Sequence, residues 1–478
     1  MNPSIGKGLL WKLLERFGVA GGQFILQIIL ARLLSPDHYG TLSIMIVFTN
    51  LANVFVQNGF NTALIQNKDV TEEDYSSVFW VTLGISGILY GTIFLCAPLI
   101  ADFYSMPDIV WPLRILALML LPGCLNSIQL AKVSREMDFK KVFVSNLAAI
   151  IISGIAGIAV ALMGGGLWAL VVQSMVNVFA ACLVMRLTVN WRIRLICNLR
   201  RVKVLFSFGW KLLCSSLLET TYQELRSLVV GKKYDSGTLG YYNRGKQFPQ
   251  FLINAVNGSV QSVMLPAMSK EQDDRSAVKQ LARNSITVSA FIIFPLMAGL
   301  AGVATPMVKL LLTDKWLPCV PYLQIYCFTM AFYPVHTCNL QAINAMGRSD
   351  IYLKLEIIKK TIGLVALIIA VACFQSPIAI AMTGVFTAFI SCFINAYPNK
   401  SLIGYSYFEQ MRDVLPSFLL SILMLGGILA IGLLPLSPII IIFLQFFGGV
   451  SIYLALSLLL RLKPLQFLLQ MLKEKKRG

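Results

Sequence analysis

The chain is dominated by apolar stretches that are long enough to cross a lipid bilayer. An α-helix needs about 20 apolar residues to span the hydrocarbon core, and about fourteen such stretches occur here. They lie near residues 11–33, 40–64, 78–100, 109–131, 140–162, 167–189, 205–230, 241–266, 281–302, 317–345, 352–373, 377–398, 413–434 and 438–460. Since a bilayer offers no partner to open backbone groups, this pattern predicts an all-α polytopic membrane protein with about 14 transmembrane helices.

The composition and the charge distribution agree with this fold class. Of the 478 residues, 57% are hydrophobic and 13% are charged, which is outside the range of soluble domains. If the stretches cross a membrane in turn, 30 of the 40 Lys and Arg residues fall on the side of both termini, and five fall on the other side. This bias predicts that both termini are cytoplasmic. It also accounts for the net charge of +18 without a nucleic-acid partner.

The two halves of the chain carry the same polar pattern. Asn-x-x-Asn-x-x-Val-Gln occurs at residues 50–57 and again at 254–261, each time within an apolar stretch. The offset between matching positions grows from 200 at Gly40 and Gly240 to 204 at these patterns. Six stretches separate the copies, so both have the same orientation. This is typical of a parallel repeat with a substrate path between its lobes.

The repeat predicts two pseudo-symmetric six-helix lobes followed by two extra C-terminal helices. The expected parts are an N-lobe at 1–190, a cytoplasmic linker at 191–204, a C-lobe at 205–400, extra helices within 401–462 and a basic cytoplasmic tail at 463–478. Basic and apolar residues are interleaved in the linker, so we expect it to lie on anionic membrane lipid. An equally simple interpretation is that its charges fix the topology alone.

The stretch 205–230 has one charged face. Its polar residues are spaced by 3 or 4 positions, which places them on one side of a helix. They are Lys211, Ser215, Glu219, Tyr222 and Arg226. A charge within the bilayer costs about 2.5–3.5 kcal/mol unless it meets water or a partner, so we expect this face to line a water-filled interior. The alternative is that Glu219 and Glu224 pair with the cations of the same helix as internal struts.

Amide side chains gather on the neighbouring stretches. Amides and tyrosines in a cleft suit a ligand with many hydroxyl groups, such as a sugar. The alternative is hydrogen bonding between helices, which is worth about 0.6 kcal/mol for each bond. The predicted sugar-contacting residues are Asn50, Asn53, Gln57, Tyr222, Gln247, Asn254, Asn257 and Gln261.

The charges placed within the stretches are mostly positive, and guanidinium and ammonium groups bind phosphate. The predicted substrate-binding residues of this cationic cavity are Lys211, Arg226, Arg244, Lys246 and Arg114. A transporter of drug cations would be expected to show the opposite sign. The two carboxylates, Glu219 and Glu224, are the candidates for coupling transport to a proton or another cation.

The sequence contains no pattern of catalytic, cofactor-binding or metal-binding residues. It has no Walker A motif for ATP and no nucleophile elbow. Its ten cysteines include no C-x-x-C pair, and its two histidines, His38 and His336, are far apart. We therefore expect no catalytic residue, no cofactor and no metal, and predict that the protein is not an enzyme.

Four segments carry a family resemblance. They are 31–40 (ARLLSPDHYG), 206–211 (FSFGWK), 239–244 (LGYYNR) and 265–274 (LPAMSKEQDD). With them, nearly the whole chain resembles Wzx-type polysaccharide exporters of the colanic-acid-exporter branch, in the polysaccharide transporter family of the MOP superfamily. The resemblance implies a flippase that moves undecaprenyl-pyrophosphate-linked oligosaccharide across the bacterial inner membrane by alternating access. The product would serve surface polysaccharide such as O-antigen, capsule or exopolysaccharide.

The predicted partners are the lipid-linked oligosaccharide, membrane lipids and other membrane proteins of polysaccharide assembly. Two transporter alternatives stay open at this point, a multidrug cation antiporter and a peptidoglycan-precursor flippase of the same superfamily. An alternative of another class is a membrane-bound polysaccharide polymerase or glycosyltransferase. Such an enzyme would be expected to carry an extended acidic outer loop, whereas the outer connections here are short.

Overall fold

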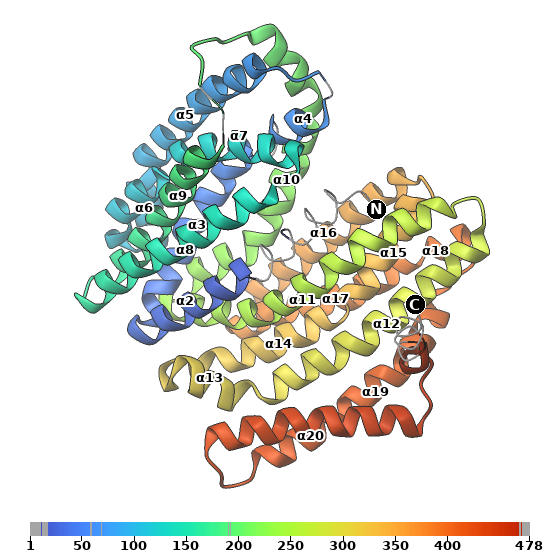
Figure 1. Ribbon diagram of the computed structural model, residues 1–478. Helices are drawn as coiled ribbons and strands as arrows, with labels where there is room; N and C mark the ends of the chain where they lie inside the picture. Colours follow the sequence, from blue (N-terminus) through green and yellow to red (C-terminus); the bar gives the residue numbers. More distant parts are fainter. Residues whose placement is uncertain are drawn as a thin grey trace. The chain divides into compact units, whose positions relative to one another are not determined.

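The computed structural model describes residue 11 and residues 18–57, 60–67, 69–189, 191, 193–467 and 470. Within these ranges all regular secondary structure is helical (Figure 1). The predicted all-α fold class is therefore confirmed. Arg192 of the predicted linker and residues 468, 469 and 471–478 of the predicted basic tail lie outside the described residues.

The chain divides into two compact units, Met1–Gly240 and Tyr241–Gly478. The described helices of the first unit are α2 (Ala20–Leu33), α3 (Pro36–Gln57), α4 (Phe60–Gln66), α5 (Glu72–Tyr104), η2 (Pro107–Ile109), α6 (Val110–Ala117), α7 (Leu120–Glu136), α8 (Phe139–Leu162), α9 (Leu167–Thr188) and α10 (Leu199–Lys233). In this unit α10 packs against α3, α4 and α5. The lobe and linker boundaries expected from the sequence stay a prediction.

The second unit begins within α11 (Ser236–Lys270). Its other described helices are α12 (Arg275–Gly302), α13 (Ala304–Leu312), η3 (Asp314–Cys319), α14 (Val320–Ala331), α15 (Tyr333–Ala345), α16 (Ser349–Cys373), α17 (Pro377–Ala396), α18 (Asn399–Leu402), α19 (Tyr407–Gly432) and α20 (Pro438–Leu459).

The order of elements repeats from one unit to the other. A 3-10 turn and a short helix precede α7 in the first unit, and a 3-10 turn and a short helix precede α15 in the second. Both α7 and α15 hold a proline in their first turn, at Pro122 and Pro334. Proline is tolerated there because its missing N–H would have no partner within the helix. Pro122 and Pro334 therefore occupy equivalent positions at the starts of two helices, which supports the repeat seen in the sequence.

Each of the fourteen predicted stretches contains a described helix or pair of helices. In the part of the chain that the structure describes, nine helical segments are long and apolar enough to cross a membrane. The 35-residue helices α10 and α11 are not among them, since charged residues on α10 and amides on α11 lower their hydropathy. The protein is therefore a multi-pass membrane protein, while the number of 14 crossings stays a prediction.

The two helices without a counterpart in the first half pack onto the second unit. Phe291 of α12 forms a buried cluster with Leu420, Met424 and Ile428 of α19 and with Tyr453 of α20. The hydroxyl of Tyr453 also donates to the carbonyl oxygen of Phe291 at 2.9 Å. Between membrane helices, van der Waals packing and hydrogen bonds supply the attraction, so this cluster holds α19 and α20 against α12.

Candidate functional site

The helix α10 carries the charged face that its residue spacing predicts. Lys211 and Ser215 are exposed, whereas Glu219, Tyr222 and Arg226 are half-buried. Gln223 donates to a carboxylate oxygen of Glu219 at 2.8 Å, and the Arg226 guanidinium lies 5.7 Å from the ring centroid of Tyr222. Successive turns therefore hold each other's polar groups. The water-filled surroundings expected for this face stay a prediction.

The first amide pattern lies on α3, which packs against α10. Its Asn50 donates from Nδ2 to Oε1 of Glu224 at 3.4 Å. Asn53 is half-buried, and Gln57 is exposed. The Asn53 side chain lies next to Gly123 of α7, because a Cβ atom placed on that glycine would lie 3.6 Å from Oδ1 of Asn53. The structure thus brings two of the predicted site residues together, Asn50 and Glu224, from stretches that are far apart in the sequence.

The cation predicted on α11 is buried within the second unit. Arg244 is 5% exposed, and its guanidinium lies 5.1 Å from the ring centroid of Trp316. It donates to Oε1 of Gln247 at 2.6 Å. A guanidinium over an indole ring is stabilised by the negative face of the ring. Lys246, two residues further on, is half-buried. Substrate binding by Arg244 and Lys246 stays a prediction.

The second amide pattern differs from the first in its contacts. Asn254 accepts a hydrogen bond at Oδ1 from Nε2 of Gln250, one turn earlier on the same helix, at 2.8 Å. Asn254 and Gln261 are exposed, whereas Asn257 is buried. The residue types of the pattern are therefore repeated, and Asn254 bonds within its own helix where Asn50 bonds to Glu224 of another helix.

The fifth predicted cation, Arg114, lies on α6 in different surroundings. Its Nε donates to the carbonyl oxygen of Phe94 on α5 at 3.1 Å. Its guanidinium lies 4.1 Å from the ring centroid of Phe94 and 5.1 Å from that of Trp111. These contacts tie α6 to α5, which is sufficient to account for a charge at this position. A role in substrate binding stays a prediction.

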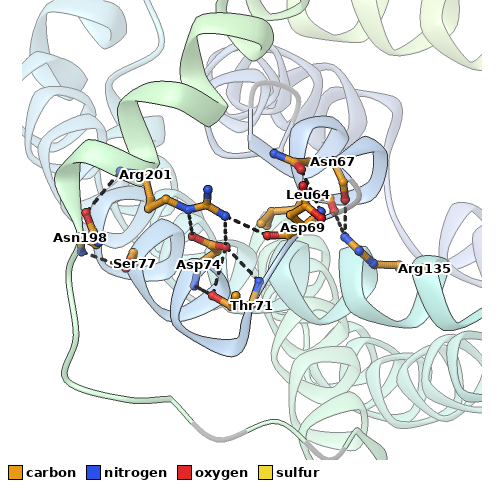
Figure 2. A network of polar contacts seen from close by, with 9 residues as sticks. All are labelled: Leu64, Asn67, Asp69, Thr71, Asp74, Ser77, Arg135, Asn198 and Arg201. Atoms are coloured by element: carbon orange, nitrogen blue, oxygen red, sulfur yellow. Dashed lines mark hydrogen bonds and ion pairs between the residues drawn. The ribbon is translucent and has the colours of Figure 1, made fainter.

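A polar network that the sequence analysis did not single out joins the start of α5 to the start of α10 (Figure 2). Nε and a terminal nitrogen of Arg201 each donate to the Asp74 carboxylate at 3.0 Å. The same terminal nitrogen donates to the carbonyl oxygen of Asp69 at 2.8 Å. Thr71 caps α5 in a capping box with Asp74, whose side chain is 3% exposed. The hydrogen bonds to Asp74 raise the pKa of the Arg201 guanidinium above its ordinary value.

A second arginine extends this network to α7 (Figure 2). Arg135 donates to the carbonyl oxygens of Leu64 and Asn67 at 3.2 and 2.6 Å, at the end of α4. Two arginines thereby hold the connection between α4 and α5 from two sides. The sequence contained one signal for this cluster, because Thr-x-x-Asp before an apolar run at 71–74 is a variant of the capping-box pattern.

The segment before α10, Trp191 with residues 193–198, is a strap that follows the first turns of α5. Nε1 of Trp80 donates to the carbonyl oxygen of Arg194 at 2.9 Å, and the amide of Arg194 donates to Oγ of Ser76 at 3.2 Å. The amide of Asn198 donates to Oγ of Ser77 at 2.9 Å. The predicted linker is therefore held by protein hydrogen bonds where it is described.

One side of this strap is buried and the other is open. Trp191 is 2% exposed, and its ring centroid lies 6.1 Å from that of Phe79 and 6.5 Å from that of Tyr75. Leu195 is 90% exposed, and Arg194 is exposed beside it. Contact of this outer side with anionic lipid stays a prediction.

The second unit has a comparable set of ion pairs at the start of α12. Lys279 and Arg283 pair with Glu409 and Asp413 of α19 at 3.1 and 2.7 Å. Beneath them lie three buried amides. Nδ2 of Asn339 donates to Oε1 of Gln410 at 2.7 Å, and Nδ2 of Asn399 donates to Oδ1 of Asn339 at 2.7 Å.

Comparison with solved structures defines the class of fold. The chain superimposes on the lipid II flippase MurJ with a TM-score of 0.74 at 17% identity, covering 95% of this chain and 99% of that one. It superimposes on an inward-facing multidrug resistance MATE transporter of the MOP superfamily with a TM-score of 0.58 at 15% identity, covering 86% and 94%. The chain therefore shares its fold with these two proteins.

Comparison of sequences defines the family. Residues 29–321 match the polysaccharide biosynthesis protein family, and the chain belongs to it. The chain is 22% identical to the succinoglycan biosynthesis transport protein ExoT of Rhizobium meliloti, over 85% of this chain and 80% of that one. It is 22% identical to the lipopolysaccharide biosynthesis protein WzxC of Escherichia coli, over 87% and 85%. It is 26% identical to the teichuronic acid biosynthesis protein TuaB of Bacillus subtilis, over 63% of each chain.

Proposed function

We propose that this protein is a flippase that moves undecaprenyl-pyrophosphate-linked oligosaccharide repeat units across the bacterial inner membrane for surface polysaccharide. Membership of the polysaccharide biosynthesis protein family is the observation that carries this proposal. The relatives named as a transport protein and as a lipopolysaccharide biosynthesis protein support it, and so does the transporter fold. The substrate would be exposed to each side in turn by alternating access.

The polar faces of α10 and α11 suit such a substrate. Lys211 and Arg226 on α10 and Arg244 and Lys246 on α11 would hold the pyrophosphate, because guanidinium and ammonium groups pair with phosphate oxygens. The amides of the two repeated patterns, with Tyr222 and Gln247, would contact the sugar. Glu224 of α10 accepts a hydrogen bond from Asn50 of α3, so a proton or cation bound by Glu224 would change the contact between these two helices. That makes it the preferred candidate for coupling to an ion, ahead of Glu219.

The proposed orientation places both termini in the cytoplasm, as the distribution of Lys and Arg predicts. Under this topology the polar network of Asp74 and Arg201 lies at the cytoplasmic end of α10, and the α10–α11 turn lies at the outer end. The protein would act without a catalytic residue or cofactor, and other membrane proteins of polysaccharide assembly would be its partners.

The proposal is tested by reversing two cations. Arg226→Glu combined with Arg244→Glu, in cells whose polysaccharide export depends on this gene, should lower export at least tenfold, because both charges would then repel the pyrophosphate. Lys354→Glu combined with Lys400→Glu is the matched control, since both are exposed lysines outside the proposed site and should leave export unchanged. Normal export by the Arg variant would refute the phosphate role.

Arg244 is buried against Trp316, so its replacement could also disturb packing. Lysine substitutions at positions 226 and 244 separate loss of phosphate binding from loss of packing. Arg226→Lys and Arg244→Lys keep the charges and should retain more export than the corresponding glutamine variants. Equal losses for lysine and glutamine, with normal membrane levels, would point to a packing role instead.

Two further assays address the alternatives. A multidrug cation antiporter would confer drug resistance when it is overproduced, and a peptidoglycan-precursor flippase would rescue cells that lack their own. The proposed function predicts neither effect. It predicts accumulation of lipid-linked oligosaccharide on the cytoplasmic face when the protein is removed.

A further inference from the structure

The two segments that introduce the repeated amide patterns meet each other in the first unit. α3 begins at Pro36 and α11 begins at Ser236, and the two helices cross within their first turns. A Cβ atom added to Gly40 would lie 1.7 Å from the carbonyl oxygen of Ser236. A Cβ atom added to Gly240 would lie 2.2 Å from the carbonyl oxygen of Pro36. We refer to this contact as the glycine crossing.

The glycine crossing is reciprocal. Positions 36 and 236, and likewise 40 and 240, are matched by the sequence repeat with the same offset of 200. Each repeat thus places its glycine against the helix start of the other repeat. Neither glycine has a positive φ, so the requirement at Gly40 and Gly240 is for space and not for an unusual backbone conformation. The two helices therefore approach each other backbone to backbone at this point.

A side-chain hydrogen bond accompanies the backbone contact at the crossing. Oγ of Ser236 donates to Oδ1 of Asp37 at 2.8 Å. A Cβ atom on Gly237 would lie 3.1 Å from the same Asp37 oxygen. Small residues allow close helix contact within membranes, where van der Waals packing and weak hydrogen bonds supply the attraction. Such a contact closes tightly, and what holds the two glycines together is close packing of backbone groups.

We propose that the glycine crossing is the reversible contact that closes one end of the transport path, and that Gly40 and Gly240 are positioning residues for this closure. The inference rests on the proposed function, because a flippase must close one side while the other is open. Under the predicted topology the crossing closes the outer side. α11 continues from Gly240 as one helix to Lys270, so opening of the crossing would be passed directly to the amides and cations of α11.

Glycine-to-alanine variants test the requirement for space. Gly40→Ala and Gly240→Ala should each lower export at least tenfold, because a methyl group at either position forces the two backbones apart. Gly84→Ala and Gly91→Ala on α5 are matched controls, since a Cβ at either position meets nothing within 4 Å, and they should export normally. Normal export by Gly40→Ala and Gly240→Ala would overturn the proposal.

A cross-link tests closure without relying on the substrate. Asp37→Cys combined with Ser236→Cys, in a variant without the ten native cysteines, should form a disulfide readily in membranes. Adding Gly40→Ala should lower the yield at least threefold, and an unchanged yield would contradict the role of the glycine. Absence of the disulfide in the glycine background would contradict the contact itself.

The effect of the cross-link on transport shows whether the glycine crossing opens during transport or stays closed throughout. A reversible closure predicts that the disulfide stops export and that a reducing agent restores it. Export that continues through the cross-linked protein would overturn the proposal. If the parent protein exports no lipid-linked oligosaccharide at all, the proposed function fails, whereas the cross-linking yields still decide whether the glycines set the contact.

Discussion

The two ends of α10 are held in different ways. At its start, Arg201 binds the buried carboxylate of Asp74, and the strap before it is hydrogen-bonded to α5. Beyond its end, the chain turns into α11, where Gly40 and Gly240 touch backbone to backbone. A helix of 35 residues rises about 52 Å, so these two attachments are far apart. The first attachment is an ion pair, whereas the glycine crossing is a close backbone contact accompanied by the hydrogen bond from Ser236 to Asp37.

This difference suggests that one end of α10 stays in contact with its neighbours during transport and that the other end moves. Breaking a hydrogen-bonded ion pair leaves donors and a carboxylate without partners, which proteins avoid. Opening the glycine crossing breaks backbone packing and a hydrogen bond from a neutral hydroxyl to Asp37, and the guanidinium of Arg201 is not involved. We therefore expect the Asp74 end to stay assembled during transport and the glycine end to open. The polar face that includes Glu224 and Arg226 lies between the two attachments.

The largest expected effect on stability comes from removing the carboxylate of the Asp74 network. Asp74→Ala deprives Arg201 and the Thr71 amide of their acceptor, which should lower the free energy of unfolding by about 2 kcal/mol. Thermal unfolding of the purified protein in detergent should show a lower midpoint. Glu73→Ala, at the exposed neighbouring position, is the control and should change the free energy by less than about 0.5 kcal/mol. Equal midpoints for the two variants would show that the charged attachment is dispensable.

A second comparison concerns the two carboxylates of the α10 face. Glu224→Gln should lower export about tenfold, equal to about 1.4 kcal/mol, because Glu224 joins α10 to Asn50 of α3 and is the preferred coupling group. Glu219→Gln should have a smaller effect, since Glu219 bonds to Gln223 one turn away on the same helix. Export is measured at several pH values for both variants. A larger loss for Glu219→Gln would reverse the assignment.

The smallest expected effect concerns the strap. Trp80→Phe keeps an aromatic ring but removes the donor to the carbonyl oxygen of Arg194, a bond worth about 1 kcal/mol. Trypsin should then cleave after Arg194 about two to three times faster in the folded protein, because local opening becomes easier by up to that amount. Trp168→Phe, at a partly exposed position away from the strap, is the control. No change in cleavage would show that Ser76 and Ser77 hold the strap unaided.

Much of the architecture could be predicted from the sequence, because hydropathy and repeat spacing are local signals. The apolar stretches predicted the helical fold class, and the paired prolines Pro122 and Pro334 marked equivalent helix starts in the two halves. The four motif segments indicated the family. These features depend on residue type and spacing along the chain, which the printed sequence contains.

The partners of individual side chains could not be predicted in the same way. Asn50 meets Glu224, 174 residues further on, and Arg201 meets Asp74, 127 residues earlier, and no periodicity encodes such pairs. The position of Arg244 in an apolar stretch predicted a cation within the protein, but its contact with the ring of Trp316 could not be predicted from the spacing. The role of Gly40 and Gly240 depends on how closely two helices cross, which only the folded backbone reveals.

The central claim is that the cationic and amide faces of α10 and α11 carry a lipid-linked oligosaccharide. It is tested most directly by reconstituting the purified protein into vesicles with fluorescent undecaprenyl-pyrophosphate oligosaccharide and measuring how fast the sugar crosses the bilayer. The account predicts rapid crossing with the parent protein and at least a tenfold slower rate with Arg226→Gln combined with Arg244→Gln. Crossing at the parent rate by that folded variant, or no crossing by the parent protein, would contradict it.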